Sequence, residues 1–415
     1  MIYLDNAATT RVKPEAADFV RAFMTAEYFN IGASYPQAAA LAARAGEARK
    51  AIAETVGARR DELYFTGSAT EANNMVLRGA IRAKNKTLLL TAGEHASVYN
   101  TAQSLKAAYT VKIAPLRADG RVDTDRLSDA VDENAALVSV IHVNNETGAV
   151  NDIAAICRAV KAKNKNCLFH SDGVQAFGKL PVNVRESGID FYTVSGHKIG
   201  APKGIAALYV RKGVYLNPLI TGGGQESGMR AGTENVPGIM GLYRALQVTG
   251  NGFCHFDNGF CHSERSEESR PITVNRQLST VNLKAVRLRE ILSDGGLKLK
   301  FNGGDTFLKS DASEGIMGNQ SPYITSVSVV GLKAETLSNL CAERGVVIGL
   351  GSACAASKEG NRVLAAMNLA RSEIDGNIRI SLCADTTDEE IERAAKVILE
   401  CAKELLDNKV KSNDK

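Results

Sequence analysis

Residues Phe191 to Lys198 read FYTVSGHK, and this stretch shows the pattern on which the fold prediction rests. Phe191 to Val194 is a short apolar run typical of a buried strand, and a polar turn follows it directly. A lysine at this position is unusual, because most lysines lie on exposed surfaces. The stretch therefore predicts a buried strand that is followed by a polar turn carrying Lys198.

The same order of apolar strand and polar turn recurs along the first half of the chain. The other predicted strands with their polar followers are Glu62 to Thr66 before Gly67, Thr87 to Thr91 before Gly93-Glu94-His95, Leu137 to Val143 before Asn144, and Asn166 to His170 before Ser171-Asp172. Helix-like segments such as Pro14 to Met24 and Ala38 to Val56 alternate with them. This alternation predicts a parallel α/β sheet, with ligands at the edge where the strands end.

From about Arg276 the chain changes character and predicts a smaller α+β domain. It contains a helix over Lys284 to Leu292, a strand over Ile324 to Val330 and a closing helix over Thr387 to Leu406. We expect a large domain over residues 15–249. A small domain is expected to combine residues 1–14 with 281–415.

Residues 250–280 fit neither predicted domain. They contain a near-repeat of Asn-Gly-Phe-Cys-His at Asn251 and Asn258, followed by a charged, serine-rich stretch. We interpret the segment as an inserted low-complexity loop. A metal site is the alternative, since two Cys-His pairs offer four ligands, but their spacing matches no zinc signature.

Composition excludes several classes of protein. The 415 residues are 44% apolar and 23% charged, and this apolar fraction argues against disorder. The net charge of +4 is too small to indicate a surface for nucleic acid or membrane. The longest apolar runs are far below the roughly 20 residues that span a bilayer. The start, MIYLDNAATT, shows no signal peptide, so we expect a cytoplasmic protein whose eight cysteines are mostly free thiols.

Two residues at strand ends suggest a cofactor. Lys198 could form a Schiff base with a carbonyl or with pyridoxal 5′-phosphate (PLP), although an exposed lysine is the ordinary alternative. Asp172 could pair with the pyridine nitrogen of PLP, although an aspartate in a turn is also common. The small-residue turn Gly67 to Thr70 opens a helix and could seat a phosphate, or simply cap the helix.

Two further residues could do chemistry. His95 follows a strand and could stack on a flat ring or move protons, although a structural histidine is commoner. Cys354 lies in the small-residue stretch Gly349 to Ser357, where a reactive thiol would be accessible. The cysteines at 157, 341 and 401 lie in helical patterns and Cys167 in a strand, so we expect these to be small core or surface residues.

Together, these motifs resemble one family. In chain order they are YLDNAATT at Tyr3 to Thr10, SATEAN at Ser68 to Asn73, Glu94-His95, HVNNETG at His142 to Gly148, Asp172 with Gln175, SGHK at Ser195 to Lys198, PKG at Pro202 to Gly204, RAGTEN at Arg230 to Asn235, GSAC at Gly351 to Cys354, and IRIS at Ile378 to Ser381. The chain resembles the cysteine desulfurases of the NifS/IscS type, in the class V aminotransferase branch of PLP enzymes. The resemblance runs from Tyr3 to about Leu406, interrupted by the insertion.

The resemblance implies a fold and a reaction. The fold would be that of fold type I PLP-dependent transferases, with a mainly parallel seven-stranded sheet in the large domain and a smaller α+β domain. The reaction would move sulfur from L-cysteine to Cys354 as a persulfide and release L-alanine. The sulfur would then pass to an acceptor for iron–sulfur cluster assembly or tRNA thiolation.

The resemblance also implies roles for individual residues. Lys198 would hold PLP and remove the Cα proton, Asp172 would pair with the ring nitrogen, Gln175 with the phenolic oxygen, and His95 would stack on the ring and shuttle protons. The phosphate would be bound by Ala69, Thr70, Ser195, His197 and, from a neighbouring subunit of a homodimer, Thr233. Asn145 would contact cofactor or substrate, and Arg379 the substrate carboxylate. No metal is implied, except that Cys354 would transiently contact a cluster held with a partner.

The sequence departs from the family pattern at two polar positions. Gln37 stands where the family has a histidine, and Ser227 where it has an arginine. These departures put rate, dimer contacts or partner docking in doubt. The alternatives left open are a selenocysteine lyase, an aminotransferase of the same family, and a weakly active sulfur-transfer or scaffold paralogue.

Overall fold

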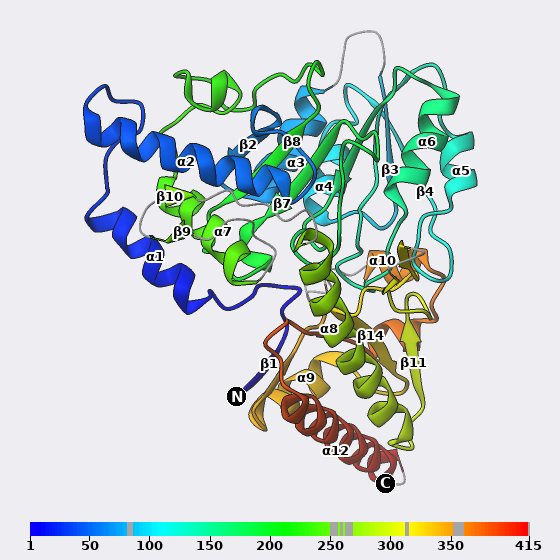
Figure 1. Ribbon diagram of the computed structural model, residues 1–415. Helices are drawn as coiled ribbons and strands as arrows, with labels where there is room; N and C mark the ends of the chain where they lie inside the picture. The colour runs from blue at the N-terminus through cyan, green and yellow to red at the C-terminus, as the bar shows by residue number, and fades with distance from the viewer. Residues whose placement is uncertain are drawn as a thin grey trace.

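The computed structural model describes residues 1–80, 86–249, 256–257, 260–261, 269–311, 315–351 and 361–413 (Figure 1). A larger domain with a central sheet lies above a smaller domain that contains both chain ends. Among the described residues, no helix is long and apolar enough to cross a membrane. The described residues also contain no group of three or more His, Cys, Asp or Glu placed to hold a metal ion.

The large domain is built on a seven-stranded sheet. Its strands, in spatial order, are β2 (Leu63–Thr66), β8 (Ala206–Val210), β7 (Phe191–Ser195), β6 (Leu168–Asp172), β5 (Ala135–Ser139), β3 (Thr87–Thr91) and β4 (Thr110–Ala114). Only β8 runs against its neighbours, because it pairs antiparallel with both β2 and β7. The predicted mainly parallel α/β sheet is therefore confirmed.

Helices cover both faces of this sheet. They are α1 (Pro14–Thr25), α2 (Pro36–Glu54), α3 (Ala69–Gly79), α4 (Ala96–Ser104), α5 (Thr124–Asp129), α6 (Ile153–Lys163) and α7 (Val236–Val248), with 3-10 turns η1 (Arg60–Glu62), η2 (Gly196–Lys198) and η3 (Gln225–Gly228). Successive strand residues pack on opposite faces: Phe191 lies in the core under α3 and α4, and Tyr192 in the core under α1, α2 and α7. Strands buried on both faces explain the continuous apolar runs of the sequence.

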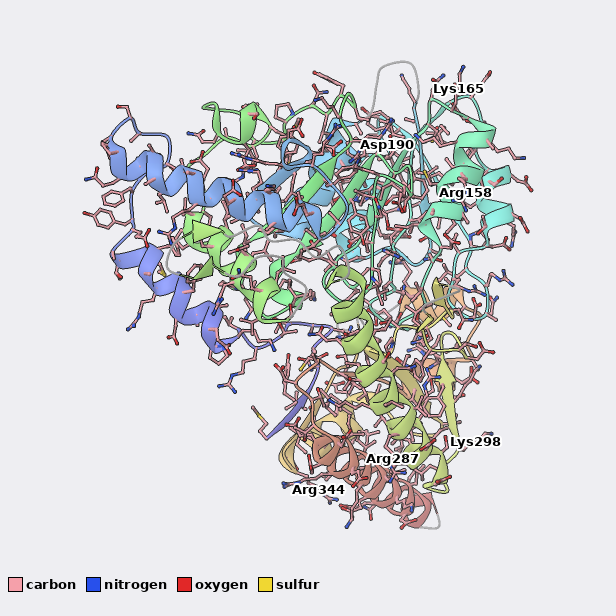
Figure 2. All side chains as sticks on the ribbon, viewed as in Figure 1. Arg158, Lys165, Asp190, Arg287, Lys298 and Arg344 are labelled. Atoms are coloured by element: carbon pink, nitrogen blue, oxygen red, sulfur yellow. The ribbon has the colours of Figure 1, made fainter. Side chains whose placement is uncertain are left out.

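A buried carboxylate fastens the start of β7. Asp190 is fully buried, and it accepts a hydrogen bond from the Phe169 N–H at 2.8 Å. Asp190 is labelled in Figure 2, and Lys161 and Arg211 each approach its carboxylate to 2.6 Å, so the buried charge is fully paired. Removing one partner of such a buried pair leaves an uncompensated charge, which is strongly destabilising. This cluster fixes the edge of the sheet opposite the one where the polar strand ends gather.

The small domain has an antiparallel three-stranded sheet and a two-stranded parallel pair. The sheet is β11 (Leu299–Asn302), β14 (Ile324–Val329) and β16 (Asn377–Ser381), and the pair is β1 (Ile2–Leu4) with β15 (Val346–Ile348). The elements of the chain not yet named are α8 (Ser269–Asp294), α9 (Ala334–Glu343), α10 (Arg362–Ala366), α11 (Arg371–Asp375), α12 (Asp388–Asn413), and the short strands β9 (Phe256–Asp257), β10 (Phe260–Cys261), β12 (Lys309–Asp311) and β13 (Gly315–Met317). The N-terminal strand therefore joins the C-terminal part of the chain.

Helix α8 begins earlier than the pattern over Lys284 to Leu292 predicts. It starts at Ser269, and its residue Leu278 is already packed in the small-domain core. The end of the segment 250–280 is thus helical, whereas the side chains of its Cys-His pairs lie outside the described residues. The insertion and the domain limits stay predictions.

One face of α8 stabilises the small domain. Its buried residues are Leu278, Val281, Ala285, Leu288 and Leu292, spaced three and four apart, and they pack with α12 and the sheet. This spacing places them on one side of the helix. The same helix also carries Leu283, which is 72% exposed.

We predict that Leu288→Ala lowers the free energy of unfolding by about 2–5 kcal/mol, because it leaves a cavity in a closed core. Leu283→Ala is the matched control on the same helix and should change it by less than about 0.5 kcal/mol. Denaturant unfolding followed by circular dichroism measures both. Equal effects of the two substitutions would contradict this packing.

Candidate active site

The polar strand ends of the large domain surround one cavity of about 250 Å³. The predicted residues that line it are Ala69, Thr70, His95, Asn145, Asp172, Gln175, Ser195, His197 and Lys198; Ala7, Ser68, Ser97, Ile141 and Val174 complete it. The strand ends come together because β6, β7 and β5 run parallel and end at the same edge.

Asp172 lies at the base of this cavity and is 3% exposed. One carboxylate oxygen accepts from the Asn73 side chain at 2.8 Å and the other from the Val174 N–H at 3.1 Å. Among the described residues Asp172 forms no ion pair with a cation. A buried carboxylate of this kind is suited to pair with a cationic ligand.

Lys198 is the last residue of η2 and reaches across to the N-terminal segment. Its Nζ donates to the carbonyl oxygens of Ala7 and Ala8, both at 2.6 Å. Burial lowers the pKa of Lys198 to about 8, with a further lowering by Arg379 and an opposing effect of Asp172 and Asp5. A larger share of neutral amine, the form that attacks a carbonyl, is therefore present near neutral pH than for an exposed lysine.

The opposite end of the cavity is suited to an anion. Ser68 caps α3 by accepting the Glu71 N–H at 3.1 Å, which is the capping alternative considered for this turn. The first N–H groups of a helix have no partner inside it, so those of Ala69 and Thr70 can bind phosphate oxygens. Ser195 lies at the end of β7, and burial and the neighbouring lysines lower the pKa of His197 to about 4.

His95 is oriented by a chain of hydrogen bonds that the sequence did not indicate. Its Nδ1 accepts the Ser97 N–H at 3.2 Å and lies 2.8 Å from the Ser97 hydroxyl. The same hydroxyl accepts from Asn73 at 2.8 Å, and Asn73 donates to Asp172. A backbone N–H can only donate, so Nδ1 must accept, and the neutral ring carries its proton on Nε2.

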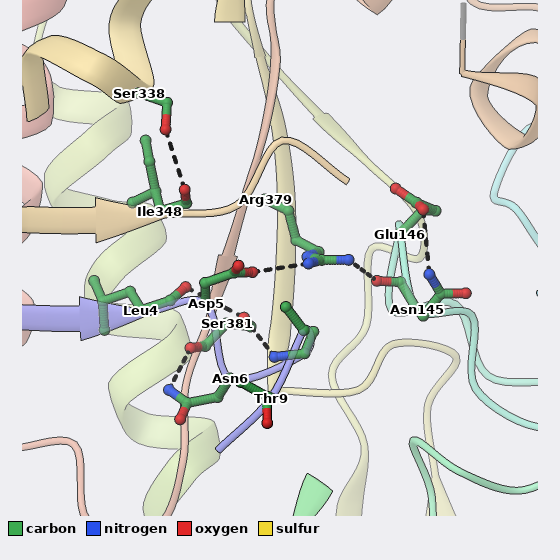
Figure 3. A network of polar contacts seen from close by, with 12 residues as sticks. Leu4, Asp5, Asn6, Thr9, Asn145, Glu146, Ser338, Ile348, Arg379 and Ser381 are labelled. Atoms are coloured by element: carbon green, nitrogen blue, oxygen red, sulfur yellow. Dashed lines mark hydrogen bonds and ion pairs between the residues drawn. The ribbon is translucent and has the colours of Figure 1, made fainter. Parts of the chain in front are cut away.

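Arg379 lies beside the cavity and already has partners (Figure 3). It is 5% exposed, donates to Asp5 at 2.8 Å and to the Asn145 carbonyl at 2.9 Å. Its Nε has no hydrogen-bond partner among the described residues. The Asn145 side chain in turn donates to Glu146, whose carboxylate also accepts from Asn361 at 3.1 Å.

Of the predicted residues that the structure describes, Thr233 lies apart from the cavity. Thr233 is exposed on the segment after η3, where Arg230 forms an ion pair with Glu71 of α3 at 2.9 Å. Cys354 lies outside the described residues. Gln37 and Ser227, the two departures from the family pattern, are both exposed and do not line the cavity.

The comparisons with known proteins agree with this architecture. Residues 2–258 match the family described as aminotransferase class-V. The chain belongs to this family. It is 36% identical over 409 residues to a cysteine desulfurase of Trichormus azollae, covering 98% of this chain and 94% of that one. It is 33% identical over 409 residues to the cysteine desulfurase IscS of Methanosarcina thermophila, covering 97% and 92%.

Solved structures of this family superpose over nearly the whole chain. A NifS-like protein has a TM-score of 0.81 at 31% identity, covering 96% of this chain and 98% of that one. A NifS-like protein from Rickettsia africae has a TM-score of 0.76 at 28% identity, covering 97% and 99%. The resemblance inferred from the motifs and the fold type I architecture are confirmed.

The class-V site allows a test of how His95 is oriented. We predict that Ser97→Ala reduces the Nε2–H form of neutral His95 by up to about tenfold, because one hydrogen bond to Nδ1 is lost. Nitrogen chemical shifts of labelled histidine measure the ratio of the two forms. Ser104→Ala, at the far end of the same helix, should leave it unchanged; an unaltered ratio in Ser97→Ala would contradict the assignment.

Proposed function

We propose that this protein is a PLP-dependent cysteine desulfurase, a sulfurtransferase that converts L-cysteine to L-alanine and carries the sulfur as a persulfide on Cys354. The observation that supports it most is one cavity that joins Lys198, Asp172 and His95 in a class-V chain similar over nearly its full length to cysteine desulfurases. The individual residue roles below are part of this proposal.

The residues of the cavity fit PLP. Asp172 offers a buried carboxylate without an ion pair in the described structure, Lys198 an amine of lowered pKa, and the start of α3 free N–H donors for phosphate. Bound there, PLP supplies an electron sink that stabilises negative charge at the substrate Cα. Gln175 lies next to Asp172 on the same wall and can bond the ring's phenolic oxygen.

Lys198 and His95 handle protons. The Nζ of Lys198 would take the Cα proton, and its lowered pKa suits a base. His95 presents Nε2 to the cavity, because Nδ1 is occupied by Ser97. It can therefore stack on the ring and donate a proton from Nε2 to the leaving product.

Arg379 is the residue that would bind the substrate carboxylate. Its partner Asp5 neutralises the guanidinium before substrate arrives, while its Nε remains without a partner in the described structure. A substrate carboxylate must therefore share Arg379 with Asp5. The guanidinium carries only one unit of charge, so it favours a substrate with a single carboxylate over a substrate that has an acidic side chain as well.

The sulfur step needs a thiolate. The Cys354 thiolate would attack the substrate sulfur: a sulfur–sulfur bond forms, the carbon–sulfur bond breaks, and its electron pair returns to the carbon that becomes the alanine methyl group. Burial raises the pKa of Cys157 to about 11 and of Cys167 to about 12, and also raises the pKa of Cys341 and of Cys401. These buried thiols are poor nucleophiles at neutral pH.

The other functions considered from the sequence are less well supported. The similar curated proteins are named cysteine desulfurases, and an aminotransferase needs no thiol such as Cys354. A weakly active paralogue is disfavoured because the cavity residues are all present and converge. Gln37 and Ser227 lie away from the cavity, so their effect on rate should be indirect.

Incubation with L-cysteine and a reductant tests the proposal. We expect sulfide and alanine in equal amounts. Lys198→Ala should lose both the visible absorbance of bound PLP and turnover, because the amine is gone. Cys354→Ala should keep the absorbance and lose sulfide release at least a hundredfold, because no thiolate accepts the sulfur.

Cys383→Ser is the matched control, since Cys383 is a half-buried free thiol, and it should retain sulfide release. Undiminished sulfide release by Cys354→Ala would refute the persulfide step. Alanine formed without sulfide would instead indicate another reaction on the same cofactor.

The sulfur acceptor is proposed from the relatives. An iron–sulfur scaffold or another acceptor protein would take the persulfide sulfur, and neither nucleic acid nor membrane would be contacted directly. A persulfide-forming thiol must start reduced, which suits a cytoplasmic location. Persulfide transfer to a purified acceptor, followed by mass spectrometry, would identify the partner.

A homodimer is proposed from an exposed apolar surface, which we call the α1–α2 surface. Its exposed apolar side chains are Met24, Tyr28, Tyr35, Leu219 and Ile220. The Arg49–Glu226 ion pair of 2.6 Å ties η3 to α2, so both segments belong to one side of the molecule (Figure 1). Exposed apolar groups on one side of a molecule commonly mark interfaces, and Thr233 lies on the same connection between β8 and α7 as Leu219 and Ile220.

We predict a dimer in sedimentation velocity at micromolar concentration. Tyr28→Asp with Ile220→Asp should shift the protein towards monomer, because two charges would be buried in the interface. Leu283→Asp, which changes an exposed apolar residue of the small domain, is the control. A monomeric wild type would contradict the proposal.

A further inference from the structure

Lys179 is a buried amine next to the candidate site that has no role in the reaction described above. It is 7% exposed, and no carboxylate forms an ion pair with it in the described part of the chain. Burial and the charge of Lys198 lower its pKa to about 7. Burying an amine without a carboxylate costs free energy, and such groups concentrate at functional sites.

The groups around Lys179 include an aromatic ring, two cationic side chains, a thiol and an amide. Its Nζ lies 5.5 Å from the ring centre of Tyr323. With Lys198 and Cys383 it lines a small cavity of about 70 Å³, and Lys198 also lines the main one. Of the charged groups that act on it, Lys198 and Arg379 are cationic and Cys383 is a thiol. Within the described part of the chain, its side-chain hydrogen bond is to Gln175.

That hydrogen bond decides which way the Gln175 amide points. Lys179 Nζ donates to Gln175 Oε1 at 3.1 Å, and Gln175 Nε2 donates to the Ala7 carbonyl at 2.9 Å. A lysine amine donates and a carbonyl only accepts, so both contacts require the same amide orientation. The amide nitrogen has a second hydrogen, and Gln175 lines the main cavity beside Asp172.

We propose that Lys179 is a positioning residue that holds the Gln175 amide with its N–H, rather than its carbonyl, towards the ring oxygen of the bound cofactor. The inference rests on the proposed PLP site. With Lys179 in place, the carbonyl end of the amide is already occupied, so it cannot rotate to face the ring oxygen. An N–H donor at that point stabilises the ionised form of the oxygen.

The test is a pH titration of the visible absorbance of the PLP-loaded protein. Lys179→Met keeps a similar length without a donor, and we expect the midpoint to rise by up to about one pH unit, a tenfold change. Lys179→Arg retains a donor and should restore most of the shift. Lys203→Met removes an exposed lysine charge near His197 and should leave the midpoint unchanged.

A double-mutant cycle separates action through Gln175 from a direct effect of charge. In a Gln175→Leu background, Lys179→Met should cause no further shift, because the amide is already gone. An equal shift in both backgrounds, or none in either, overturns the proposal. A wild type that holds PLP but releases no sulfide would refute the desulfurase function and leave this spectral result standing; a wild type that holds no PLP would refute both.

Discussion

The burial of the Asp172 carboxylate at the end of β6 is the constraint on which the rest of the site depends. A buried charge needs donors on both oxygens, and the structure provides them from Asn73 of α3 and from the backbone of Val174. Because Asn73 also donates to Ser97, the same requirement fixes α3 against α4 and orients His95. One desolvated carboxylate thus sets the positions of two helices and of a catalytic candidate.

The sheet makes this arrangement possible. Parallel strands β5, β6 and β7 deliver Asp172 and Ser195 to one edge, and η2 continues from β7 to bring Lys198 beside them. The strands can be apolar along their length because helices cover both faces. The polar side chains of the site then gather where the strands end, and the cavity forms among them.

This logic also explains what could be predicted from sequence. Lys198, Asp172 and His95 each follow an apolar run, so their placement at the strand ends is readable from the chain. Ser97 and Lys179 do not follow an apolar run. In the sequence, nothing distinguishes them from any other serine in a helix or lysine in a turn. The role of Ser97 comes from its contact with Asn73, which is distant in the sequence. The role of Lys179 comes from a turn that brings it beside Gln175, four residues earlier. The sequence pattern predicts a later start for α8, because the burial of Leu278 depends on packing within the small-domain core and not on a local pattern.

The N-terminal segment couples the two domains at the site. Its strand β1 pairs with β15, which precedes the stretch carrying Cys354, and Asp5 holds Arg379 of β16. Two residues further on, the Ala7 carbonyl accepts from both Lys198 and Gln175 of the large domain. A shift of this segment would therefore move the substrate arginine and release the lysine together. The carbonyl oxygens of Ala7 and Ala8 accept hydrogen bonds from the Lys198 amine, so the site holds this amine without a carboxylate partner among the described residues. A carboxylate in their place would raise the pKa of Lys198 and so reduce the neutral form that the chemistry needs.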